Sequence, residues 1–293
     1  MQKDPAYLSF VNSATAYINL TTIVGPAGVA SFQSNAAAMY KDAIASLPST
    51  DPTVIAGFKS VYDKKVELMA TTTPQVELLL AINSANAVRF TAAIQQSLST
   101  GYIYVNSSNP FANPVIDPRY LTNPADLAVL REGLKIARRI GQAAPYNGFT
   151  GEAAPGADVE TDDAWDAWLK TQSSTEFHPT GTCSMLPKTS GGVVDANLRV
   201  YGLANVRVAD ASVLPVTMSC HTMAPTYGLA EQASTLIRAF YSGSSSSGGS
   251  SSSSKPSSGS NSSSGGEDAA AALARPWVMA LTLVVAVAAS VAL

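Results

Sequence analysis

FHPTGTCSMLPKTSGGVVDANLRVYGLANVRVADASVLPVTMSCHTMAPTYGLAEQASTLIRAFY, from Phe177 to Tyr241, contains both histidines of the 293-residue chain, His178 and His221. Proline and glycine follow the first histidine closely, and a proline follows the second, so each ring lies in a restricted segment. A short β-rich piece and a turn are predicted between them. Imidazole changes charge near neutral pH, so two such rings brought together would suit proton transfer. The alternative is two structural histidines with satisfied hydrogen bonds.

Five motifs follow one another in this stretch: His-Pro-Thr-Gly-Thr-Cys-Ser-Met at 178–185, Gly-Gly-Val-Val-Asp at 191–195, Leu-Arg-Val-Tyr-Gly at 198–202, Val-Arg-Val-Ala-Asp-Ala-Ser at 206–212 and Ser-Cys-His-Thr-Met-Ala-Pro at 219–225. In this order they closely resemble the C-terminal signature of the glucose–methanol–choline (GMC) oxidoreductases, the FAD enzymes that include aryl-alcohol oxidase and glucose oxidase. The resemblance implies an α+β fold: a substrate-binding domain, with an antiparallel sheet and helices, plus the C-terminal portion of the FAD-binding domain.

Alcohol oxidation requires a group that accepts a proton, and the two histidines can supply it. The reaction removes a hydride from carbon, which FAD accepts in these enzymes, and a proton from oxygen, which a neutral imidazole can accept. By resemblance His178 is the base and His221 its hydrogen-bonding partner, although the sequence leaves the order open. Histidine at the second position, where many relatives have asparagine, points towards the aryl-alcohol and glucose oxidase branches. The implied substrate is a small primary alcohol, with a leaning towards aryl alcohols, or a sugar, and the acceptor is oxygen or a quinone.

Further roles carry over by resemblance. Contacts with FAD are expected at Asp210, Ala211, Thr222 and Met223. Phe177, directly before the proposed base, resembles the aromatic residue that narrows the access path in aryl-alcohol oxidase, and it is equally interpretable as a core residue. For Asp210 the alternative is a plain turn or helix cap. No metal ligand is expected.

Composition excludes other classes of function. A net charge of −3 and a pI near 5.4 give no electrostatic footprint for nucleic acid. Two cysteines, Cys183 and Cys220, pair once or remain thiols, and a Cys–His nucleophile would lack an evident third group to orient the base. The Gly-x-Gly-x-x-Gly spacing that binds the FAD pyrophosphate occurs nowhere in the chain. We therefore expect a C-terminal portion of the family enzyme, with the N-terminal Rossmann unit absent.

Helices and strands are interleaved without regular βαβ alternation, which favours α+β. Apolar spacing and capping residues predict helices over 31–47, from Asp51-Pro52 to about 69, over 123–140, from Thr161, and over 226–241. Strands are predicted over 76–82, 88–94, 102–105 and 206–210. The expected domains are 1–175, mainly substrate-binding, and 176–241, which closes the FAD site.

The C-terminal region has a different composition. Residues 242–266 are almost wholly serine and glycine, which predicts a disordered linker, and 267–275 form a polar, alanine-rich spacer. Trp277–Leu293 is a run of 17 residues without a charge. This order is typical of a glycosylphosphatidylinositol (GPI) attachment signal over 267–293, with the attachment site around 261–265; a transmembrane tail is the alternative.

Secretion is therefore expected, with a membrane-anchored extracellular location, although no signal peptide is visible at the start of the sequence. N-glycosylation sequons at Asn19, Asn106 and Asn261 are consistent with a secreted glycoprotein. Two hypotheses follow. The chain is the C-terminal portion of a surface FAD-dependent alcohol oxidoreductase, or it is a non-catalytic surface-anchored protein that retains the GMC scaffold.

Overall fold

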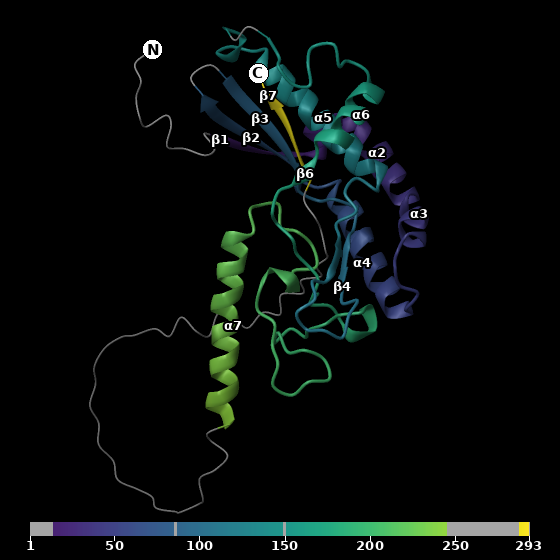
Figure 1. Cartoon of the computed structure of the whole chain (residues 1–293), viewed down its shortest axis with the longest axis vertical. Helices are drawn as coiled ribbons and strands as arrows, with labels where there is room; N and C mark the ends of the chain where they lie inside the picture. Colours follow the sequence, from purple (N-terminus) through teal and green to yellow (C-terminus); the bar gives the residue numbers. More distant parts are fainter. Residues whose placement is uncertain (1–13, 85–86, 149–150, 245–286, 293) are drawn as a thin grey trace, which may run out of the picture.

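The computed structural model describes residues 14–84, 87–148, 151–244 and 287–292 (Figure 1). Its main sheet has five strands in the order β1-β2-β3-β7-β6, and β4 and β5 form a separate two-stranded sheet. All strand pairs in the described residues are antiparallel, as the α+β prediction requires. The strands are β1 (Ala14–Asn19), β2 (Pro74–Ser84), β3 (Ala87–Ile94), β4 (Tyr102–Tyr104), β5 (Val115–Asp117), β6 (Ser174–Thr175) and β7 (Val287–Ala292).

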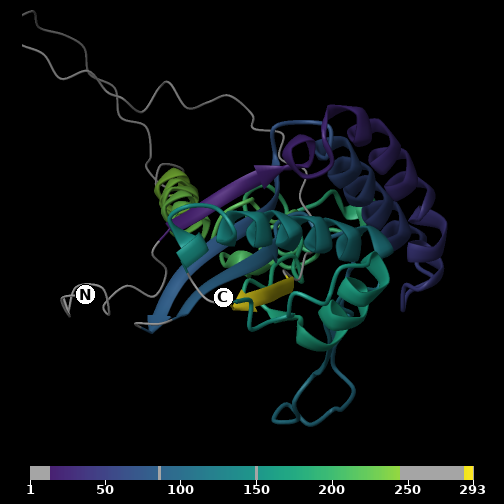
Figure 2. The ribbon, with the colours of Figure 1, turned by 90° about the horizontal axis from the view of Figure 1, so that it is seen from above.

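Helices cover one side of this sheet, whereas the last helix stands apart from it. Figure 2 shows α5 lying across the strands, with the N-terminal helices grouped beside it. In Figure 1 the long α7 stands next to the irregular region that follows β6. The helices are α1 (Leu20–Val24), α2 (Pro26–Ala38), α3 (Tyr40–Ala45), α4 (Pro52–Leu68), α5 (Pro124–Gly141), α6 (Asp162–Gln172) and α7 (Met223–Ser244).

Three helices begin at the capping residues that the sequence indicates. Asp51 accepts hydrogen bonds from the first backbone N–H groups of α4, Asn123 does so for α5, and Thr161 for α6. Pro52 and Pro124 occupy the first helical position, where a missing N–H costs nothing. Local chemistry therefore fixes where these helices start.

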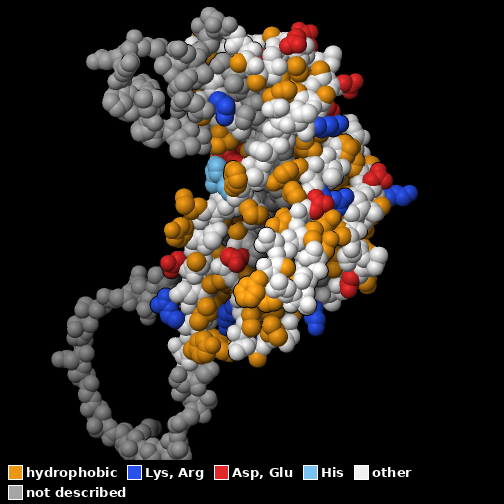
Figure 3. Space-filling view, in the orientation of Figure 1, with side chains coloured by type: hydrophobic (Ala, Val, Ile, Leu, Met, Phe, Trp, Pro, Cys, Tyr) orange, Lys and Arg blue, Asp and Glu red, His pale blue; other side chains and the backbone are white. Residues whose placement is uncertain are grey.

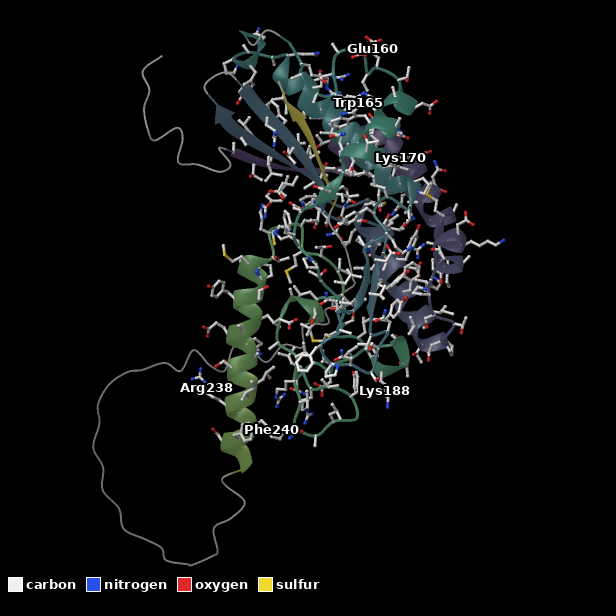
Figure 4. The ribbon with its side chains drawn as sticks, viewed as in Figure 1. Glu160, Trp165, Lys170, Lys188, Arg238 and Phe240 are labelled. Carbon is white, nitrogen blue, oxygen red and sulfur yellow. The ribbon has the colours of Figure 1, made fainter. Side chains whose placement is uncertain are left out.

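The main core lies between the sheet and the helices above it. Leu130 and Leu134, one turn apart on α5, are completely buried. Trp165 and Leu169 of α6 are buried with them, and Figure 4 shows where Trp165 lies on that helix. Val76 of β2 faces the same cluster from the sheet. At roughly 1.5–3 kcal/mol for each large side chain, burial of this face provides much of the driving force for joining the two layers.

The region after β6 differs from the prediction. Residues 206–210 do not form the predicted strand, and the β-rich piece between the histidines consists of isolated bridges, such as Val194 with Val200 and Arg199 with Arg207. The backbone turns at Gly191 and Gly202, both with positive φ, before a ladder can extend. This part of the chain is a folded loop over a small core of its own, not a sheet edge.

Two helix boundaries also differ from expectation. The helix predicted over 31–47 divides at Met39 into α2 and α3. The last helix begins at Met223, two residues before Pro225, because the first four N–H groups of a helix have no intrahelical partner and a proline there breaks no bond.

The predicted GPI signal falls largely outside the described residues, which end at 244 and resume for 287–292. Those last six residues form β7, between β3 and β6. No helix among the described residues is long and apolar enough to cross a bilayer.

Candidate active site

The fold brings the two histidines together. His178 Nε2 and His221 Nδ1 are 3.3 Å apart, and the rings meet edge to face with centroids separated by 4.8 Å. Figure 3 shows the histidine side chains at the surface, beside an acidic group. The predicted pair is therefore a physical unit, and the rings exchange one hydrogen bond.

Backbone hydrogen bonds hold the His178 segment. The chain leaves β6, and Thr175 Oγ1 accepts a hydrogen bond from the Phe177 amide at 2.9 Å. Beyond the histidine, Cys183 N donates to Ser212 O at 2.9 Å and Met185 N to Val213 O at 2.9 Å. His178 thus lies between a strand end and a short backbone ladder, which explains why the two motifs at 178–185 and 206–212 occur together.

Side chains from the sheet hold the His221 segment. Ser219 Oγ donates to Pro74 O at 3.0 Å, where β2 begins. Buried Gln96, just after β3, donates from Nε2 to Ser219 Oγ at 3.0 Å and to Thr217 O at 2.7 Å. The loop before α7 is therefore attached to the start of β2 and to the segment just after β3.

Glu77 is a site residue that our sequence analysis missed. It lies on β2 with 0% exposure, and its Oε1 contacts His221 Nε2 at 3.0 Å. Gln95 Nε2 donates to its Oε2 at 3.2 Å, and the Tyr17 hydroxyl on β1 also hydrogen-bonds to it. The sequence signal that could have identified it is a single carboxylate inside the apolar run at 76–82. A charge buried in such a strand requires hydrogen-bonding partners, which indicates a site.

Glu176 is the second missed residue. Its side chain is 9% exposed, and its Oε2 lies 3.7 Å from His178 Nδ1. It hydrogen-bonds to Glu77. Burial, then the charge of Glu77, raises the pKa of Glu176 to about 8. The histidine pair is thus backed by two buried carboxyl groups.

The surroundings favour a neutral base and an unreactive thiol. Burial, then the charge of His221, lowers the pKa of His178, although Glu77 opposes this. A neutral imidazole can accept a proton at neutral pH. Burial and Glu77 raise the pKa of Cys220, so its thiolate, the nucleophilic form, is disfavoured. Both Cys183 and Cys220 are free thiols, and this environment is unfavourable for the Cys–His alternative.

The residues predicted to contact FAD lie in two separate segments, 210–211 and 222–223. Asp210 accepts a hydrogen bond from Ser212 N at 2.8 Å and caps the short 3₁₀ helix η4 (Ala211–Val213). Asp210 therefore acts as a helix cap, which is the alternative given from the sequence. Its contact with FAD stays a prediction. Thr222 and Met223 continue from His221 into α7, and the Met223 side chain is 71% exposed.

Phe177 is not a core residue. It is 81% exposed and has a φ of 63°, an unusual conformation for a bulky residue. Phe177 is next to His178 in the chain, and its side chain is exposed to solvent and not packed in the interior. The core interpretation is therefore wrong, and the access role remains a prediction.

Glu176, His178 and His221 bring three potential ligand atoms within 4.8 Å of one another. We assign no metal ion to them, because both ring nitrogens of His221 already contact protein side chains. The arrangement is instead a chain of hydrogen-bonding acid and base groups, suited to holding and moving protons.

Comparisons with known proteins identify the family. Residues 97–230 match the C-terminal profile of the family described as GMC oxidoreductase. The GMC oxidoreductase family protein Mala s 12 of Malassezia sympodialis is 38% identical over 230 residues, covering 78% of this chain and 37% of that protein. Pyranose dehydrogenase 3 of Leucoagaricus meleagris is 41% identical over 163 residues, or 55% of this chain and 27% of the relative.

Solved structures give the same result. An FAD-dependent oxidoreductase from Chaetomium thermophilum superimposes with a TM-score of 0.71 at 28% identity, covering 78% of this chain and 39% of that one. A fungal aryl-alcohol oxidase gives 0.68 at 27% identity, covering 78% and 38%. The chain belongs to the GMC oxidoreductase family and contains its C-terminal part. It spans well under half the length of the relatives that it matches.

Proposed function

We propose that this chain is the C-terminal part of an FAD-dependent oxidoreductase that oxidises the CH–OH group of a small alcohol. The observation that carries the proposal is the hydrogen-bonded series His178–His221–Glu77. Family membership supports the reaction class, and a neighbour described as FAD-dependent supports the cofactor. The non-catalytic scaffold explains the series less well, because a fully buried carboxylate without a chemical role would only cost stability.

The residues present fit one side of a flavin site. The His221 side chain is 44% exposed, and Met223 and Phe177 beside the pair are more exposed still. No described side chain at the site can accept a hydride, so the reaction needs a redox cofactor. When bound, FAD would supply that acceptor, with Asp210, Ala211, Thr222 and Met223 as the proposed contacts from this chain.

The chain's own residues would handle the proton. A substrate hydroxyl placed between the rings would replace their mutual hydrogen bond, because His178 Nε2 and His221 Nδ1 face the same point. Whichever of these two nitrogens is unprotonated would accept the hydroxyl proton, and the N–H of the other ring would donate to the oxygen. Glu77 would stabilise any positive charge that develops on His221, because its carboxylate lies 3.0 Å from the far nitrogen of that ring.

Two observations bear on the substrate class. Relatives named pyranose dehydrogenase and aryl-alcohol oxidase favour a sugar or an aryl primary alcohol. Exposed Phe177 beside the base favours a ring-shaped substrate that can stack on it. The electron acceptor is oxygen or a quinone. A GPI-anchored extracellular location is proposed from the linker and the apolar run alone.

The test uses the complete flavoprotein that contains this chain. Under anaerobic conditions, flavin reduction by an aryl alcohol and by a pyranose is followed by absorbance, which isolates the first half-reaction from reoxidation. Replacing His178 with Ala should slow reduction by ~10²–10⁴ with flavin still bound, which is the usual loss for a group that takes part in acid–base catalysis. The H178A/H221A double variant should cost much less than the sum of the single effects. Near-wild-type reduction in H178A would refute the proposal.

A further inference from the structure

Two carboxyl groups lie buried behind the histidine pair, and each faces a different ring. Glu77 is completely buried against His221, and Glu176 is 9% exposed beside His178. They hydrogen-bond to each other. Two carboxylates cannot share a hydrogen bond when both are ionised, so one of them holds a proton.

The partners identify which carboxyl is ionised. Glu77 faces three potential donors, from Tyr17, Gln95 and His221. Glu176, in contrast, has a buried Oε1 without a hydrogen-bond partner among the described residues. A carboxylate is stable where donors converge, and an isolated carboxyl favours its neutral form. Glu77 is therefore the anion and Glu176 the acid.

We propose that Glu176 is a positioning residue of the histidine pair, donating a hydrogen bond as a carboxylic acid to ionised Glu77. The two carboxyls then carry a single negative charge, which holds His221 with its proton on Nε2. His221 Nδ1 is left as the acceptor in the contact with His178. The inference deepens the proposed function and rests on it, since it assigns how the acid–base pair is set before a substrate arrives.

A change of pH should be visible at the rings. Burial and Glu77 raise the pKa of Glu176 to about 8, so above this pH the pair carries two negative charges and the field at both rings changes. The titratable groups around the two carboxyls are Tyr17 on β1, His178, and His221 and Cys220 before α7. Burial raises the pKa of Tyr17 to about 12 and also raises that of Cys220, so Glu176 should titrate before them.

The experiment is nuclear magnetic resonance of the full chain labelled with ¹⁵N in histidine. Because the chain has two histidines, each ring gives its own signals. We expect the His221 ring in the Nε2–H tautomer at pH 7, and a step in the shifts of both rings near pH 8. E176Q should abolish the step and keep the tautomer, because its amide still donates to Glu77.

Three further variants make the result specific. E77Q should lose the tautomer preference, because the anion that selects it is gone. E160Q, at an exposed residue just before α6 (Figure 4), should change neither signal. C220S should keep the step, which would show that the step does not come from titration of the Cys220 thiol. Circular dichroism checks that each variant is folded, and the wild-type titration is informative by itself.

The inference is overturned by an Nδ1–H tautomer at His221, by the absence of a step in the wild type, or by a step that persists in E176Q. A stoichiometric metal ion in the purified chain would also overturn it. None of these readouts requires turnover. A complete enzyme that fails to oxidise alcohols while its rings behave as described would therefore refute the proposed function and leave the proton assignment intact.

Discussion

Glu77 shows how much of the site depends on one side chain. Its neighbours on β2 pack into the core, yet this residue places a charge at the same depth. The register puts it opposite Tyr17 on β1 and Ala93 on β3. The Tyr17 hydroxyl hydrogen-bonds to its carboxylate, and the small Ala93 side chain leaves space beside it. A buried carboxylate is tolerated because donors surround it, and the same donors orient it towards His221.

The lowered pKa of His178 predicts how the rate depends on pH. The histidine pair can accept a proton only while both rings are neutral, and burial keeps His178 neutral below the usual pKa of 6.5. The rate of anaerobic flavin reduction should therefore stay on its plateau as the pH falls through 6.5, and decline only at lower pH. A decline that begins above pH 6.5 would contradict a buried base.

Glu176 should make the protein less stable as the pH rises. Its pKa is raised from 4.5 to about 8, so its contribution to stability is complete below 4.5 and is lost as the pH rises through that range. E176Q does not titrate and should gain stability relative to the wild type between pH 5 and 8, on the order of 1–3 kcal/mol. Urea unfolding at several pH values measures this, and E160Q should show a constant difference.

Elements with local signals were predicted well from the sequence. The caps at Asp51, Asn123 and Thr161, each followed by an apolar stripe, predicted three helices, and short, largely apolar runs predicted β2 and β3. The prediction at 206–210 was wrong because a β-rich composition does not reveal whether a partner strand exists.

The candidate site was only half predictable for a similar reason. His178 and His221 belong to a continuous motif and were found together. Glu77 is 144 residues from His221 in sequence, and only the strand order brings it there. Glu176, two residues before the base, carried no pattern that separated it from an ordinary surface carboxylate.

The packing of α4 against η3 (Lys188–Ser190) gives a prediction at this scale. A Cβ added to Gly57 of α4 would lie 2.2 Å from Ser190 O, so one backbone must move. Gly57→Ala should destabilise the protein by ~1–3 kcal/mol. Gly228→Ala in α7 is the matched control, because nothing lies within 4 Å of its added Cβ. It should be neutral or stabilising by up to ~1 kcal/mol, since alanine favours helices. Equal effects of the two in urea unfolding would contradict the close packing.

At the scale of the whole molecule, one region is well packed and the other exposes apolar side chains. The sheet and its helices enclose one large core, whereas the region from β6 to α7 has two small apolar clusters and exposes Met223, Tyr227 and Tyr241. Met223 follows His221 by two residues, and a group of exposed apolar side chains marks a surface that other atoms cover in the working protein. This is the side on which we propose that FAD binds.

The C-terminal run gives a prediction for the mature protein. If residues 267–293 are a GPI signal, they are removed, and peptides from Trp277–Leu293 should be missing from a mass-spectrometric map. A phospholipase specific for GPI should then release the protein from membranes. Recovery of those peptides from the mature chain would instead favour the place of Val287–Ala292 as β7 of the sheet.

The distances along the chain between the groups of the site have a consequence for folding. No local segment can assemble it, because its contacts join β2, the end of β6 and the loop before α7. Closing such long loops is slow and comes after helix formation. Acid–base competence should therefore be among the last properties that a newly made chain acquires. The contact between the two imidazoles would then report that folding is complete.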